Sequence, residues 1–237
     1  MSLIHPTSLV LTIDSAAEEL FFQRSIDLAC QNDLASMLVS RQVHSGINSG
    51  FFICFTSESP AHLRLFTGEI LHTEFACRHL TLIEAARLLV LLPEPGYLVS
   101  NSIQLASQRM ENTCYSSFCS KGECKPLTIA YMRYLAASVT DENILRLESF
   151  LGKLSAFRDN KGKWHGFPFF YTLLMLGEIH DLPAARQELE YAAHYADKQI
   201  SQVEAGEPYS NRRKSILNTM MMWSVYNASP LLLGQYG

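Results

Sequence analysis

Helical spacing is the feature of this sequence that most limits its fold. Between residues 182 and 200, apolar side chains recur at steps of three and four, and charged side chains fill the positions between them. Residues 144–154 repeat the pattern behind Thr140, Asp141 and Glu142, residue types that favour a helix start. Residues 167–176 are instead apolar on nearly every side, as expected of a helix covered all round. A covered helix followed by an amphipathic one predicts an inner–outer pair.

The pattern predicts helix pairs of this kind that start near residues 72, 128 and 171, a spacing in the range of helical arrays. We therefore expect a single all-α domain over residues 1–237, with units near residues 62–95, 112–157 and 158–200. Its antiparallel helical hairpins should form an open α/α-toroid-like or solenoid array. Placing Thr73 on Thr172 without a gap also brings residues 85–87 onto residues 184–186, both Ala-Ala-Arg, which favours an internal duplication.

The remaining segments give local expectations. Residues 16–30 and 33–43 predict an N-terminal helix pair, and residues 46–60 predict a short strand or a plug into the core. Asp181 is the expected N-cap of a helix whose first turn holds Pro183. Residues 112–126 and 158–166 are expected to be loops.

Composition excludes several classes of function. The apolar share is 48% and the charged share 18%, which excludes intrinsic disorder, and a net charge of -4 does not attract nucleic acid. The chain offers no membrane span, since its longest uncharged stretch is interrupted by polar residues and Pro230. Six cysteines and an acidic N-terminal region predict free thiols in a cytoplasmic protein. With so few charged residues, part of the protein surface is expected to be apolar. Such a surface favours a ligand cavity or the interface of a homo-oligomer.

The segment from Asp159 to Thr172 carries a family resemblance. This segment has an Asp, a Gly and a Trp, in that order, ahead of an aromatic helix: Asp159, Gly162 and Trp164. The pattern resembles the repeats of terpenoid cyclases and protein prenyltransferase β-subunits, which fold as α/α toroids. In those proteins aromatic rings line an apolar pocket. The resemblance thus implies an apolar or isoprenoid-like small molecule, bound by aromatic side chains: Trp164, Phe167, Phe170, Tyr171, Phe66 and Tyr131.

The family's catalytic motifs are missing from this sequence. Its aspartates stand apart from one another, and the position comparable to a prenyltransferase zinc-binding histidine is Tyr171, a poor zinc ligand. The leading interpretation is therefore a cyclase-like binding scaffold with no assigned reaction and no cofactor. The first alternative is a protein-interaction scaffold or obligate homo-oligomer without a ligand pocket.

Two clusters offer metal chemistry. Cys114, Cys119 and Cys124 are separated by four intervening residues each, the longest spacing usual in structural zinc sites, and the sequence does not show that a fourth ligand such as His165 or Cys77 is near. Packing cysteines are therefore the favoured interpretation. The second alternative is a metal-dependent hydrolase built on His180 and Asp181, with His165 and Asp197 as further ligands. Three more histidines are expected to be surface or buried hydrogen-bonding side chains: His62, His72 and His79.

Overall fold

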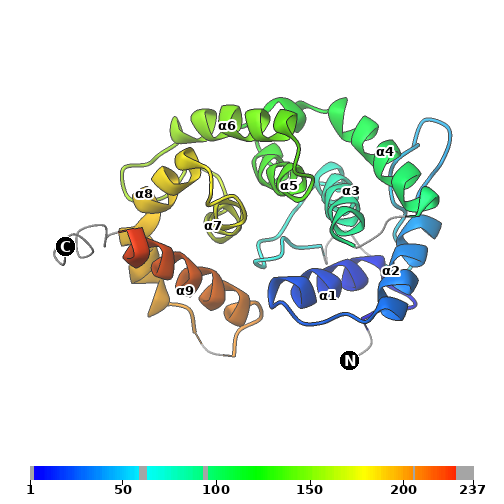
Figure 1. Cartoon of the computed structure of the whole chain (residues 1–237), viewed down its shortest axis with the longest axis horizontal. Coiled ribbons are helices and arrows are strands. Elements are labelled where there is room, and N and C mark those ends of the chain that lie inside the picture. Colours follow the sequence, from blue (N-terminus) through cyan, green and yellow to red (C-terminus); the bar gives the residue numbers. More distant parts are fainter. Residues whose placement is uncertain (1–2, 59–62, 93–95, 205, 228–237) are drawn as a thin grey trace, which may run out of the picture. The chain divides into compact units, whose positions relative to one another are not determined.

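The computed structural model describes residues 3–58, 63–92, 96–204 and 206–227. The described part is all-helical, which confirms the predicted fold class (Figure 1). Its strand-like pairing is confined to isolated bridges within that part, such as Gln42 with Phe52. None of the described helices combines the length and apolarity that a bilayer crossing requires. The elements are α1 (Leu9–Phe21), α2 (Leu28–Ser40), α3 (Glu74–Leu91), α4 (Tyr97–Glu111), η2 (Cys114–Ser117), α5 (Cys124–Ala137), α6 (Asp141–Ser155), α7 (Phe169–Glu178), α8 (Pro183–Ile200) and α9 (Ser210–Asn227).

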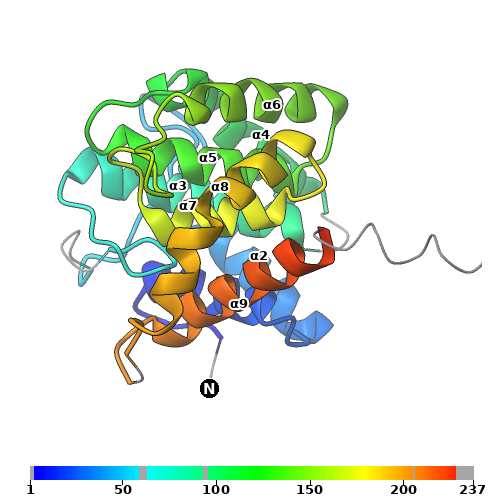
Figure 2. The same ribbon diagram turned by 90° about the vertical axis from the view of Figure 1, so that its left-hand side faces the viewer.

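The chain divides into two compact units, Met1–Ile144 and Leu145–Gly237. In the first unit α3 and α5 lie side by side, and α3 also packs against α1, α2 and α4 (Figures 1 and 2). In the second unit α7, α8 and α9 pack against one another in pairs. The expectation of one domain stays a prediction.

Covered and amphipathic helices alternate along the chain. In α3, 13 of 18 residues are buried, whereas α4 buries 3 of 15. The same contrast holds between α5 and α6, with 9 of 14 against 4 of 15, and between α7 and α8, with 6 of 10 against 5 of 18. The amphipathic pattern seen in the sequence therefore corresponds to real differences in burial.

Three local predictions are wrong. The first helix begins at Leu9, not near residue 16, because Ser8 accepts a hydrogen bond from the Leu11 N–H and caps it there. The N-cap of α8 is Leu182, which has no capping side chain, so Asp181 does not cap that helix. The alignment of Thr73 with Thr172 is not structural either, since it places the end of α3 on the start of α8.

A buried ion pair joins the two central helices of the first unit. Arg133 of α5 donates from Nη1 to Glu84 Oε1 of α3 at 2.8 Å, and both side chains are almost completely buried. A buried ion pair of this kind is often no more stabilising than apolar residues of similar volume, because both charges lose their hydration. Residues 51–52 behave as the predicted plug, since Phe51 and Phe52 are buried.

Candidate metal centre

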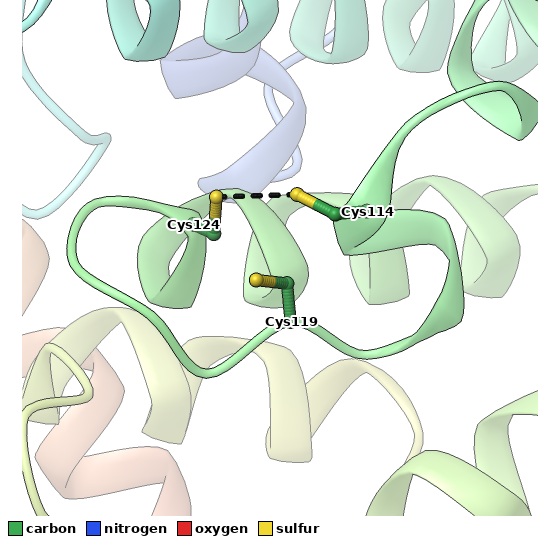
Figure 3. A group of neighbouring side chains, drawn as sticks. All are labelled: Cys114, Cys119 and Cys124. Atoms are coloured by element: carbon green, nitrogen blue, oxygen red, sulfur yellow. Dashed lines mark hydrogen bonds between the residues drawn. The ribbon is translucent and has the colours of Figure 1, made fainter.

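Three cysteine side chains meet at the N-terminal end of α5. Cys114 begins η2, Cys119 lies in the following loop, and Cys124 is the first residue of α5 (Figure 3). Their three Sγ atoms all lie within 4.8 Å of one another, and those of Cys114 and Cys124 are 3.4 Å apart. All three are free thiols. The sequence favoured packing cysteines here, yet the structure brings their sulfurs together.

The backbone conformation explains how three thiols with four residues between successive cysteines can lie close together. Phe118 adopts a left-handed conformation with φ of +67°, which reverses the chain directly before Cys119. The Thr128 hydroxyl of α5 then donates to the Cys119 carbonyl at 2.8 Å and holds the loop against that helix. Gly122, with φ of +48°, makes the second turn, which leads into α5 at Cys124. A spacing rule based on one tight turn does not apply, because two turns separate the three thiols.

A glutamate anchors the C-terminal side of the loop. The Glu123 carboxylate accepts the N–H groups of His72 and Thr73, at 2.6 and 2.8 Å, and also the Thr73 hydroxyl. Thr73 is the N-cap of α3, so this carboxylate binds the N-terminal end of that helix. Cys124 follows Glu123 directly and is the first residue of α5. Its position is therefore fixed both by α5 and by the bonds of Glu123 to the start of α3.

The thiols differ in acidity. Burial, the largest single effect, raises the pKa of Cys119, but hydrogen bonds from the Lys121 N–H and the two other thiols together outweigh it, so its pKa lies below the ordinary value. Burial and the neighbouring sulfurs raise the pKa of Cys124 to about 12. Cys114 is exposed, so the cluster opens to solvent on its side.

The sulfur spacing fits one metal ion. A tetrahedral zinc with Zn–S bonds of about 2.3 Å needs sulfurs about 3.8 Å apart, which small side-chain movements from the present positions would provide. Thiolates of an iron–sulfur cluster surround several metal atoms and lie further apart. No other His, Cys, Asp or Glu joins this group within the described ranges. Three protein ligands would leave one coordination position open.

A buried histidine forms a hydrogen bond with the residue that follows Cys114. His79 of α3 pairs through Nδ1 with the Tyr115 hydroxyl at 2.9 Å, and Tyr115 directly follows Cys114. Burial and, secondarily, the charges of Arg78 and Arg109 lower the pKa of His79 to about 4, so this imidazole is neutral. His79 is thus a buried hydrogen-bonding side chain and His72 is exposed, as predicted. His62 lies outside the described residues.

The other predicted metal pair is not assembled into a site. His180 and Asp181 lie in the turn between α7 and α8, with His180 Nε2 3.6 Å from Asp181 Oδ1. The Asp181 side chain is 90% exposed, and His180 Nδ1 lies 3.0 Å from the Gly177 carbonyl oxygen. In the described part of the chain, His165 and Asp197 do not complete a group of ligands around them.

The predicted aromatic ligand-binding residues lie in packed regions. Trp164, Phe167, Tyr171, Phe66 and Tyr131 are all buried, and Phe170 is half-buried. Neither of two cavities in the first unit, of about 300 and 550 Å³, is lined by any of these six side chains. Their role in ligand binding stays a prediction.

The indole of Trp164 is buried and hydrogen-bonded. It stands between a loop and α7, and its Nε1–H donates to Glu188 Oε2 at 2.7 Å. Arg158 donates to both oxygens of the same carboxylate, at 2.9 and 3.2 Å. Glu188 could not be identified as this partner from local sequence patterns, because it lies 24 residues later, on the buried side of α8.

Comparisons of the chain with family models, with curated proteins and with solved structures find no match. The resemblance to cyclase-like repeats therefore depends on the sequence pattern around Trp164 alone. Function has to be argued from the chemistry of the site.

Proposed function

We propose that this protein binds one thiophilic metal ion, with Zn²⁺ the best fit, through Cys114, Cys119 and Cys124. The convergence of three sulfurs within 4.8 Å carries the proposal. Soft thiolate ligands select zinc, copper(I) and iron–sulfur clusters over hard cations, and the short spacing favours a single ion. This proposal departs from the expectation, drawn from the sequence, that these cysteines only pack.

The open side of the cluster favours an accessible ion. Structural zinc sites close the coordination sphere with four protein ligands, whereas three-ligand sites keep a position for water or a small molecule. Cys114 is exposed, so such a molecule could reach the ion from solvent. The proposed function is therefore metal binding with one exchangeable position.

Elemental analysis of the purified protein tests the proposal. We expect about one zinc per chain at neutral pH, and loss of the metal in Cys119→Ser and Cys124→Ser, because a hydroxyl is a poor replacement for a thiolate ligand. Cys30→Ser is the matched control, since Cys30 lies in α2 and does not belong to the cluster. Substoichiometric metal, or metal that the two Ser variants retain, would exclude the site.

We also propose that the antiparallel helical hairpins form an open α/α-toroid-like or solenoid array. The alternation of covered and amphipathic helices supports this arrangement. It is the pattern that the resemblance around Trp164 implies. An experimental structure in which successive helical hairpins do not stack side by side would exclude it.

A second candidate function is the binding of an apolar small molecule. It is supported by the cavity of about 300 Å³ lined by Val10, Phe52, Ile53 and Leu63, among others, a volume at the lower end for ligand sites. Calorimetry with geraniol, a small isoprenoid alcohol, tests it. We expect saturable binding that Ile53→Asp weakens at least about tenfold, because the new charge would be desolvated. Binding that is not saturable, or that Ile53→Asp leaves unchanged, would exclude this site.

A further inference from the structure

Two of the three thiols are in direct contact. The sulfurs of Cys114 and Cys124 are 3.4 Å apart and face each other across the loop (Figure 3). A disulfide bond is about 2.05 Å long, so an approach of about 1.4 Å would bring the two atoms to bonding distance. This pair is therefore placed for covalent closure as well as for metal binding.

The two ends of the loop are held differently. Cys124 belongs to α5 and follows Glu123, whose carboxylate is fixed to the N-terminal end of α3. Cys114 is exposed at the first residue of the one-turn helix η2. We expect the Cys114 side chain to move during closure, because it is exposed whereas Cys124 is half-buried. Its exposure also makes its sulfur accessible to a small oxidant.

We infer that a peroxide oxidises this pair to a Cys114–Cys124 disulfide, and that this bond releases the metal ion. One sulfur attacks the peroxide, the O–O bond breaks, and a sulfenic acid and one water form. The second thiol then attacks that sulfur, the S–S bond forms, and a second water leaves. Two thiols thus lose two electrons and two protons, and the peroxide is reduced to two waters. The release step depends on the metal binding proposed above, because the disulfide removes two of its three ligands.

Peptide mapping of the metal-free protein tests the disulfide directly. Trypsin cleaves after Lys121 but not at the bond between Lys125 and Pro126, so Cys124 lies on residues 122–133 and the other two thiols on residues 110–121. After hydrogen peroxide and alkylation without reductant, we expect these two peptides to be linked, with fragment ions that place the bond at Cys114.

A matched pair of variants makes this result decisive. Cys119→Ser should keep the link, because Cys114 and Cys124 remain, and dithiothreitol should remove it. In Cys114→Ser the Cys114–Cys124 bond is impossible, and the yield of linked peptides should fall at least fivefold. No link in the wild-type protein, or a link that Cys119→Ser abolishes, overturns the inference.

A measurement of zinc release distinguishes a failure of this inference from a failure of the proposed metal site. In zinc-loaded protein, peroxide should release zinc to a chromogenic indicator in step with disulfide formation, and dithiothreitol followed by zinc should restore binding. If the protein holds zinc and peroxide leaves it bound, the inference is wrong while the metal site stands. If the protein never binds zinc, the metal site is wrong, and the peptide mapping still decides the disulfide.

Discussion

At the scale of single residues, Trp164 has the clearest packing role among the side chains that the sequence singled out. It is 2% exposed, stacks on Phe169 and contacts the edge of Tyr191. Trp164→Ala should lower the free energy of unfolding by about 3 to 5 kcal/mol, because it empties a large aromatic site. It also leaves the buried Glu188 without one donor. A urea melt measures the change.

Tyr97→Ala is the matched control for Trp164→Ala. Tyr97 is also a large aromatic residue, but it is 83% exposed, so its loss should change stability by no more than about 0.5 kcal/mol. If both variants unfold at the same urea concentration, Trp164 is not a packing centre. The resemblance around it would then have no structural consequence.

His79 should make the stability of the protein depend on pH. Its pKa is about 4 in the folded chain against 6.5 when unfolded, because burial and the nearby Arg78 and Arg109 disfavour the imidazolium. Below pH 6.5 the unfolded state binds more protons, so stability falls as the pH drops toward 4, by up to about 3 kcal/mol. Denaturant melts between pH 4 and 7 measure this slope.

Two variants isolate the contribution of His79. In His79→Leu the slope between pH 4 and 6.5 should flatten, whatever the cost of losing the bond to Tyr115. In His72→Gln, where the exposed imidazole is removed, the slope should match the wild type. An unchanged slope in His79→Leu would assign the pH dependence to other groups.

The sequence could identify residue types that suit the site, but not that their side chains lie close together in the fold. It marked Cys114, Cys119 and Cys124 as metal candidates, yet the favoured reading was packing, because spacing rules assume one turn. The left-handed conformation of Phe118 cannot be foreseen from residue type, since a bulky side chain rarely adopts it. His79 and Tyr115 meet across 36 residues, a long-range contact that no local pattern predicts.

At the scale of elements, two helix starts depend on glutamates from distant segments. Glu58 accepts hydrogen bonds from the Ser8 hydroxyl and from the N–H groups of Leu9 and Val10, at 2.7 to 3.0 Å, at the start of α1. Glu123 does the same for α3. Each carboxylate faces the positive end of a helix dipole. These contacts explain why α1 begins at Leu9, earlier than periodicity indicated.

Glu58→Ala should therefore destabilise the protein by about 2 to 3 kcal/mol, because several backbone donors lose a charged acceptor together. Glu58→Gln should cost less, since one amide oxygen still accepts. Glu111→Ala, at an exposed site at the end of α4, is the control and should be near neutral. Thermal melts compare the three. Equal melting temperatures for Glu58→Ala and Glu111→Ala would show that this cap does not contribute.

Element type was easier to predict than element boundaries. Residues 141–154 and 182–200 were expected as helices and correspond to α6 and α8 within two residues, because their apolar stripes run the full length of each helix. The start of α5 was expected at residue 128 but lies at Cys124, since a helix that opens in a cysteine-rich loop has no apolar stripe there. The alternation between covered and amphipathic helices was visible in the sequence, because burial on all sides requires apolar residues on all sides.

At the scale of the whole molecule, helical cores rather than the metal should hold the fold. Leu82, Ile83 and Leu88 of α3 and Leu127 and Ile129 of α5 are completely buried and form part of this helical core. A chain of 237 residues can bury enough apolar surface to fold without a metal, unlike a small zinc finger. We therefore expect metal binding to order residues 114–124 and to leave the helices unchanged.

Removal of the metal with a chelator should accordingly change the far-ultraviolet circular dichroism by less than about a tenth. The spectrum should be helix-dominated in both states, with strand content below about one fifth, because strand-like pairing in the described residues is limited to isolated bridges. Cys119→Ser, which cannot complete the site, should give the same spectrum as the chelated wild-type protein. A cooperative loss of helical signal on chelation would mean that the metal supplies folding energy to the whole chain. The loop would then be part of the structural core rather than an exchangeable site at its edge.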